Sequence, residues 1–220
     1  MALMAGLASA AIESFSVNYS EGNPIWSTPY NMTLSQFDTQ SGTRVLSKVT
    51  LTFTAQQSAD INFENGTDSA FDGSPALAGA QVALTGTGAI NLSSALNISG
   101  IPAHSFAANG AESGLPTYNG TGGDYFSFGN IESDLYTGIV EKTSDFSPFL
   151  GTGLISYDMT SLGTWILSGG GDAQSTVSQY LTSGTLKVDY TYSPIPEPAT
   201  ASMTVLVLIA GFWIRRRFID

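Results

Sequence analysis

Strict alternation of apolar and polar side chains limits more than any other feature how this chain can fold. Residues 49–55 and 186–192 alternate without a break, and their threonines and charged side chains fall on one face. Successive side chains of a strand point to opposite faces, so this period predicts half-buried antiparallel strands. The same pattern predicts strands at residues 15–19, 30–34, 59–63 and 80–84.

Turn-forming sequences separate these alternating runs. They are Glu21-Gly22-Asn23-Pro24, Gln40-Ser41-Gly42, Asn65-Gly66, Asp72-Gly73-Ser74-Pro75 and Asn119-Gly120. Many strands with turns at short spacing predict an all-β fold, an antiparallel β-sandwich with the jelly roll as its main variant. At typical strand lengths, the central part of the chain has room for roughly 8–12 strands. Short helical turns are considered only at residues 133–136 and 172–180.

The charge balance excludes one large class of partner. Between residues 12 and 193 there are 16 acidic residues, opposed only by Arg44, Lys48, Lys142 and Lys187. Nucleic-acid binding needs cations facing the phosphates, so we expect no nucleic-acid partner. Divalent cations remain open as partners, and the carboxylates are equally explained as solubilising groups. The chain has no cysteine, which excludes disulfides and thiolate metal sites.

The N-terminal residues 1–11 are apolar, rich in small side chains, and contain Ala8-Ser9-Ala10. This matches the small-residue cleavage site of a secretory signal, although no basic region precedes it. We therefore interpret residues 1–11 as the remnant of a signal peptide. A short buried helix or strand at the edge of the domain is the alternative.

The C-terminal segment predicts a single membrane-spanning helix. Residues 199–214 carry no charge, and as a helix of 1.5 Å per residue they would span roughly 24 Å. The residues proposed to lie in the membrane include Ala199, Val205, Leu206, Leu208, Trp213 and Ile214. Arg215, Arg216 and Arg217 follow at once, which predicts that this end stays in the cytoplasm and the preceding domain lies outside the inner membrane.

Pro196-Glu197-Pro198 stands directly before that segment. Prolines remove backbone donors and disfavour helix in the residues before them, so this peptide is expected to be extended and accessible. The order of Pro-Glu-Pro, apolar segment and arginine cluster resembles the PEP-CTERM sorting signal. The resemblance implies recognition by an exosortase, a membrane cysteine protease-transpeptidase, with cleavage near the motif. A plain tail anchor is the alternative.

A second resemblance concerns the domain between the two ends. A strand ends at Phe37-Asp38, a turn follows at Gly42, and an alternating threonine-rich strand comes next at residues 46–53. This arrangement is similar to choice-of-anchor domains of type E, which implies a β-sandwich ectodomain of unknown activity. From the residues alone we expect a buried aromatic, an Asx-type turn and the second strand of a hairpin. The expected organisation is a signal remnant at 1–11, an ectodomain at 12–193 and a sorting signal at 194–220.

Catalytic chemistry has little support in the sequence. His104 is the only histidine, and no Gly-x-Ser-x-Gly sequence supplies a nucleophile for a triad. Glycoside hydrolysis needs two carboxylates close together. The candidate pairs are Asp60 with Glu64 and Glu132 with Asp134. Both pairs read equally well as solvated strand or loop edges. We therefore predict that the protein is not an enzyme and needs no cofactor, calcium apart.

Calcium and carbohydrate are the two ligand classes left open. Asp68 and Asp72 lie in glycine-rich stretches, as do Asp124, Asn130 and Asp134, the first candidates for a calcium site. Exposed aromatic side chains could stack on sugars, but they more often fill a core. The aromatic residues in question are Trp26, Tyr30, Tyr118, Tyr125, Phe126, Phe128, Tyr136 and Trp165.

The features together predict a non-enzymatic exported protein of a bacterial surface or extracellular matrix. Its expected partners are an exosortase, the inner membrane as a transient tether, and exopolysaccharide. A carbohydrate-binding module is the main alternative, and a secreted hydrolase is the third.

Overall fold

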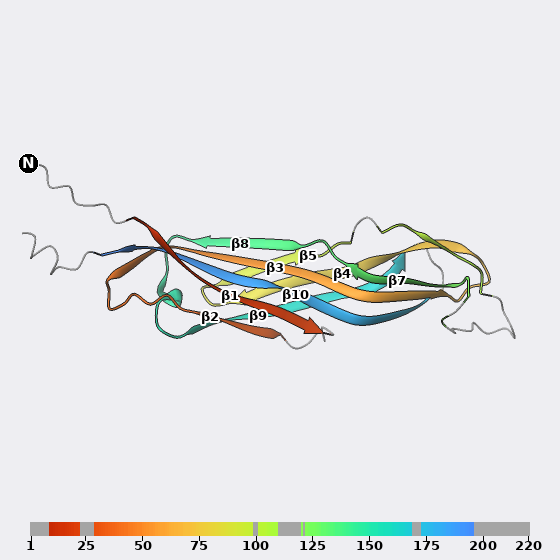
Figure 1. Cartoon of the computed structure of the whole chain (residues 1–220), viewed down its shortest axis with the longest axis horizontal. Coiled ribbons are helices and arrows are strands. Elements are labelled where there is room, and N and C mark those ends of the chain that lie inside the picture. Colours follow the sequence, from red (N-terminus) through yellow and green to blue (C-terminus); the bar gives the residue numbers. More distant parts are fainter. Residues whose placement is uncertain are drawn as a thin grey trace, which may run out of the picture.

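The computed structural model describes residues 9–22, 29–98, 101–109, 120, 122–168 and 173–195. This part of the chain is all-β, with ten strands and one short 3₁₀ helix at Ser147–Phe149. The strands form two antiparallel sheets of five strands each, which lie face to face along an elongated molecule (Figure 1). The predicted all-β antiparallel class is confirmed. Within the described residues no helix has the length and apolar character needed to cross a membrane.

The first sheet is built on two very long strands, β3 (Arg44–Asn65) and β10 (Ala173–Pro194), paired along almost their whole length. β1 (Ala11–Gly22) pairs with the second half of β10. The other side of β3 is shared by β8 (Tyr136–Lys142) and β7 (Tyr125–Glu132), one after the other. At about 3.3 Å per residue, a 22-residue strand such as β3 is about 70 Å long.

The second sheet repeats this plan. Its long strands are β4 (Phe71–Gly86) and β9 (Leu154–Ser168), and β2 (Tyr30–Ser35) pairs with β9. The free side of β4 is shared by β5 (Ile90–Ala95) and β6 (His104–Phe106). We call the end where β1 begins and β10 finishes the terminal end, and the opposite end, where β3 finishes, the far end (Figure 1).

Strands are found at every predicted position, and the runs at residues 49–55 and 59–63 belong to one unbroken strand, β3. Two local predictions are wrong. Residues 72–75 are not a turn but part of β4, where Gly73 pairs with His104 and Pro75 with Leu167. The helical turns considered at 133–136 and 172–180 are absent, because the first is the link from β7 to β8 and residues 173–180 are strand.

The turn at residues 40–42 is confirmed, although its role differs from the prediction. Gln40, Ser41 and Gly42 have φ of 47°, 59° and 87°, and the Gln40 N–H donates to Asp38 Oδ1 at 2.8 Å. The turn does not close a hairpin, because β2 belongs to the second sheet and β3 to the first. It instead carries the chain from one sheet to the other, beneath the fully buried Phe37.

The core between the sheets is divided into two apolar clusters. The terminal-end cluster is large and includes Phe53, Tyr157 and Tyr190, whereas the far-end cluster consists of Ala59, Ile61, Phe63, Phe106 and Ile131. A buried polar layer of Gln57, Ser161 and Thr182 lies between them. The Gln57 amide donates to Ser161 Oγ, which lies 3.0 Å from Thr182 Oγ1. Both sheets are irregular at this level, with register shifts in β10 between Ser178 and Leu181 and in β4 between Ala78 and Gln81.

Candidate functional site

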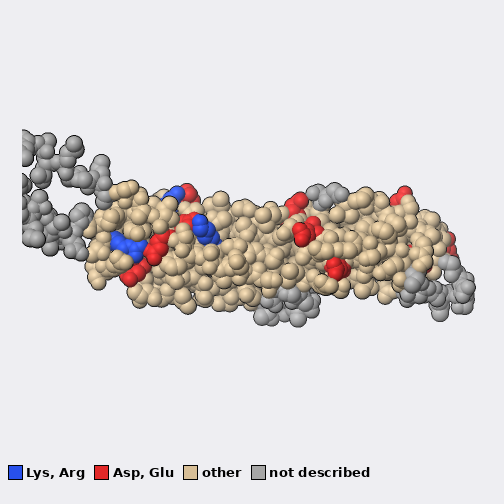
Figure 2. Space-filling model, viewed as in Figure 1, with Lys and Arg blue, Asp and Glu red and all other residues tan. Residues whose placement is uncertain are grey.

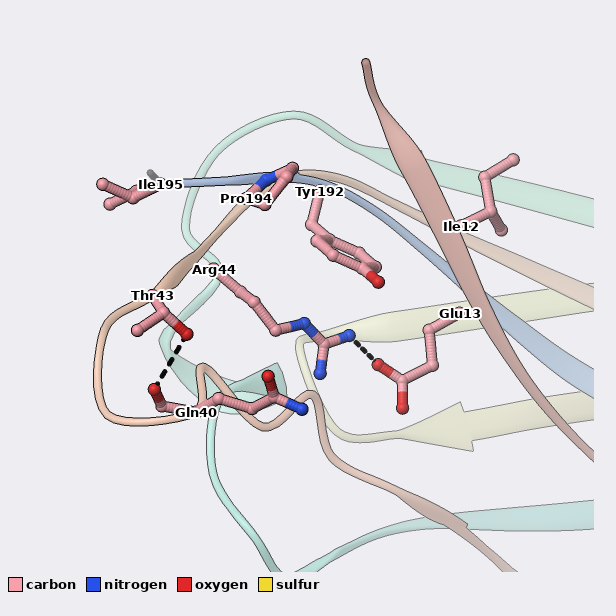
Figure 3. A pocket seen from close by; sticks show the side chains of 8 residues that line it. All are labelled: Ile12, Glu13, Gln40, Thr43, Arg44, Tyr192, Pro194 and Ile195. Carbon is pink, nitrogen blue, oxygen red and sulfur yellow. Dashed lines mark hydrogen bonds and ion pairs between the residues drawn. The ribbon is translucent and has the colours of Figure 1, made fainter. Parts of the chain in front are cut away.

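A pocket of about 540 Å³ opens at the terminal end of the sandwich (Figure 3). Four segments far apart in the sequence form it: the start of β1, the turn at residues 40–43, the start of β3 and the end of β10. Its lining residues are Ile12, Glu13, Gln40, Thr43, Arg44, Tyr192, Pro194 and Ile195. These segments meet because β1 and β10 are paired antiparallel, with Ala11 opposite Tyr192.

Arg44 is the central residue of this pocket, and its side chain is 9% exposed. Its guanidinium lies 4.5 Å from the ring centre of Phe37 and 4.0 Å from that of Tyr192. The same group donates to Glu13 and, through Nη1 at 3.1 Å, to the Asp38 carbonyl (Figure 3 shows the contact with Glu13). Arg44 therefore connects β3 to β1 across the intervening strand β10 and closes the open end of the core.

The electrostatics of the pocket keep Arg44 charged. Burial alone would lower the pKa of its guanidinium, but the hydrogen bond and negative charge of Glu13, together with Tyr192, outweigh burial and raise the pKa of Arg44 above its ordinary value. Its Nε is buried and has no hydrogen-bond partner in the described part of the chain. Among the described residues that line the pocket, the one carboxylate, Glu13, is paired with the one cation, Arg44.

The last described residue, Ile195, lies beside this pocket. The Ile195 N–H donates to the Thr43 carbonyl at 2.7 Å, which continues the pairing of β10 one residue beyond the strand. The next residue in sequence is Pro196. All residues of the predicted sorting signal, from Pro196-Glu197-Pro198 through the apolar segment to Arg215, Arg216 and Arg217, lie outside the described residues. The signal remnant is also outside them, up to Ala8.

The calcium candidates do not converge on one site. Asp124 precedes β7, Asn130 lies within it and Asp134 follows it. Eight strand residues span about 26 Å, so Asp124 and Asp134 are held far apart. Among the described residues, no group of three or more histidine, aspartate or glutamate side chains is arranged to hold a metal ion. Asp72 accepts a hydrogen bond from Ser105.

His104 is part of the aromatic packing at the far end. Its ring stacks on Phe126 with centroids 3.6 Å apart and meets Phe106 edge-on at 5.0 Å. Within the described residues its side chain makes no hydrogen bond to a serine or carboxylate, as a catalytic triad would need. His104 therefore lies among the aromatic side chains Phe106, Phe126 and Phe128 at this end of the molecule.

The structure does not support either of the two carboxylate pairs considered for glycoside hydrolysis. Asp60 and Glu64 are four residues apart on β3, about 13 Å along the strand, which exceeds the separation that hydrolysis needs. Glu64 is buried, at 6% exposure, and accepts hydrogen bonds from the Gly120 N–H at 3.1 and 3.3 Å. Glu132 accepts a hydrogen bond from Gln56 at 3.3 Å. Asp134 is exposed in the link after β7.

Most of the aromatic candidates pack against the core. Tyr30 and Tyr136 contact the terminal-end cluster, whereas Phe126 and Phe128 contact the far-end cluster. Tyr125 is different, because it lines a second pocket at the far end. Trp26, Tyr118 and the side chain of Trp165 lie outside the described residues.

The Arg44 pocket was not predicted. One signal in the sequence could have indicated it. Arg44 lies two residues before Leu46, so the two side chains point to the same face of β3. Both are buried, which places an arginine at a core-facing position. Such a position requires a partner for the charge. The partner, Glu13, is 31 residues away in sequence and cannot be identified from spacing.

No protein-family model matches this chain, and no curated protein matches it. Among solved structures it is similar to a mutant VP2 protein of infectious bursal disease virus in T=1 particles, with 13% identity and a TM-score of 0.15 over 91% of this chain and 48% of that one. A structure of the Gt strain of the same virus gives 12% identity and a TM-score of 0.13 over 92% and 48%. The chain thus spans about half the length of these structures, and similarity this low carries no argument.

Proposed function

We propose that this is a non-enzymatic exported protein whose β-sandwich is held at the inner membrane by its C-terminal segment until an exosortase cleaves near Pro196-Glu197-Pro198. The tripartite tail carries the proposal: Pro-Glu-Pro, an uncharged segment and three arginines in that order. The transmembrane helix and the jelly-roll description of the sandwich belong to the same proposal. After cleavage the domain joins the cell surface or the extracellular matrix, in association with exopolysaccharide.

The geometry of the terminal end supports this arrangement. Pairing of β10 continues as far as Ile195, the last described residue, and Pro196-Glu197-Pro198 follows it directly in sequence. Only three residues separate Ile195 from Ala199, a reach of about 13 Å when extended. A tethered domain would stand close to the membrane on its Arg44 end. The start of β1 and the end of β10 both lie at that end, opposite the far end of the sandwich (Figure 1).

Intact mass spectrometry of the chain from a host with an exosortase, and from the same host without it, tests the proposal. We expect a shortened C-terminus only in the first host. Replacing the motif by Pro196→Ala with Glu197→Ala should abolish the shortening, whereas Pro194→Ala, two residues earlier, should leave it intact. A chain that ends at Asp220 in the exosortase host would contradict the proposal.

A further inference from the structure

Along β3, the outer face of the first sheet carries mostly neutral hydroxyl and amide side chains, with Asp60 as the one carboxylate between residues 50 and 62. In β3, the residues of this face from 50 to 62 are Thr50, Thr52, Thr54, Gln56, Ser58, Asp60 and Asn62. The row at Thr54 continues the pattern, because Thr54 lies between Thr185 of β10 and Thr137 of β8, whereas the rows at Thr50 and Thr52 include Asp189, Glu141 and Lys187. Hydroxyl and amide groups both donate and accept hydrogen bonds, as the hydroxyls of a sugar do.

Charge divides this molecule along its length. The described cations, Arg44, Lys48, Lys142 and Lys187, all belong to the terminal half, as Figure 2 shows for the visible face. Three of them are paired with Glu13, Glu141 and Asp189. The described residues of the far half carry carboxylates and no cation. An anionic ligand would therefore be repelled from the far half.

A pocket of about 170 Å³ lies on the outer face at the far end. The register of the sheet brings its residues together: Gln174, Glu64 and Tyr125 form one row across β10, β3 and β7, and Thr176 and Asn62 form the next. The Asn62, Gln174 and Thr176 side chains make no hydrogen bond to any other described residue. Glu64 is held in the wall by the Gly120 N–H.

We propose that this far-end pocket binds one ring of a neutral saccharide. The phenol ring of Tyr125 supplies an apolar surface for the C–H face of the sugar, and Asn62, Gln174 and Thr176 supply donors and acceptors for its hydroxyls. The volume is smaller than the roughly 300–1,000 Å³ of pockets for drug-sized ligands, which suits a single ring. The Glu64 carboxylate and the lack of nearby cations select against uronic or sulfated sugars.

This inference rests on the proposed association with exopolysaccharide, but it does not depend on processing of the tail. The test uses the full-length chain in a sugar-free detergent, titrated with neutral gluco-, galacto- and manno-tetrasaccharides and with oligogalacturonate, and followed by NMR. At least one neutral series should bind and shift the amide signals of residues 62, 125 and 174. Oligogalacturonate should bind at least about tenfold more weakly.

Variants locate the binding on the sheet. Tyr125→Ala and Gln174→Ala should each weaken binding by about fivefold to tenfold, since each removes one contact. Thr52→Ala, on the same face near the terminal end, should leave it unchanged. Thermal unfolding of each variant controls for folding. If the wild-type chain binds a neutral saccharide but the amide shifts lie elsewhere, the proposed site is wrong, while the proposed association with exopolysaccharide stands. If no neutral series binds at 10 mM, the site and the association with exopolysaccharide are both wrong. Neither result bears on cleavage of the tail, which the mass measurement tests.

Discussion

Two buried tyrosines of this core differ in whether their hydroxyl group has a hydrogen-bond partner. Tyr157 and Tyr190 are both fully buried, and burial raises the pKa of each phenol above its ordinary value. The Tyr190 hydroxyl donates to the Ser35 carbonyl at 2.9 Å and so ties β10 to the second sheet. The Tyr157 hydroxyl is buried without a hydrogen-bond partner among the described residues. A buried polar group without a partner costs free energy, whereas a bonded one contributes.

The two residues should therefore respond in opposite directions to loss of the hydroxyl. Tyr157→Phe should leave the free energy of unfolding unchanged or raise it by up to about 1 kcal/mol, because it removes an unsatisfied group. Tyr190→Phe should lower it by about 1 kcal/mol, because it removes the hydrogen bond from the hydroxyl to the Ser35 carbonyl. Urea unfolding of both variants at neutral pH measures the difference. Equal destabilisation by the two substitutions would contradict the conclusion that only the Tyr190 hydroxyl makes a stabilising hydrogen bond.

The long central strands β3 and β10 come very close to each other at Gly184. Gly184 of β10 lies opposite Ala55, and a side chain there would overlap the Thr54 carbonyl and the Tyr19 hydroxyl. Tyr19 Oη donates to that same carbonyl at 2.7 Å, so the space is already occupied. Glycine is required at this position for lack of room rather than for an unusual backbone conformation.

Gly184→Ala should lower the free energy of unfolding by about 1–3 kcal/mol, the usual cost of forcing atoms into a filled site. Ser183→Ala, one residue earlier and on the outer face, is the matched control and should change it by less than about 0.5 kcal/mol. Denaturant unfolding of the two variants makes the comparison. A Gly184→Ala protein as stable as the control would show that β1 and β3 can move apart without cost.

The alternation of apolar and polar side chains in the sequence predicted where strands lie. It did not predict how long each strand is or which strands pair with each other. The alternation of apolar and polar side chains is interrupted at Gln57, a polar residue at a core-facing position of β3. The strand continues through it because Ser161 and the Leu162 carbonyl accept from its amide. Residues 72–75 have turn chemistry, yet pairing on both sides holds them in β4. The Arg44 pocket and the far-end pocket both depend on which strands are neighbours, information that a local period does not contain.

At the scale of the whole molecule, the sandwich has two cores of unequal size joined by shared strands. Among the described residues, the terminal-end cluster contains many more buried side chains than the far-end cluster, and it is also closed by Arg44. The polar layer at Gln57 and the register shifts in β4 and β10 lie between them. Apolar burial is the main source of local stability, so the two halves should differ in the free energy of opening.

Hydrogen exchange along β3 provides an internal comparison, because one strand crosses both cores. Residues 49–55 are paired with β8 and β10, and residues 58–64 with β7 and β10, so both stretches are central in the sheet. We expect amides at 61 and 63 to exchange at least about tenfold faster than those at 51 and 53, through local opening of the far end. Equal protection along β3 would mean that the polar layer joins the two cores into one cooperative unit. If the far end does open first, the proposed saccharide should slow exchange at 61 and 63 and leave 51 and 53 unchanged, since a ligand stabilises the state that binds it.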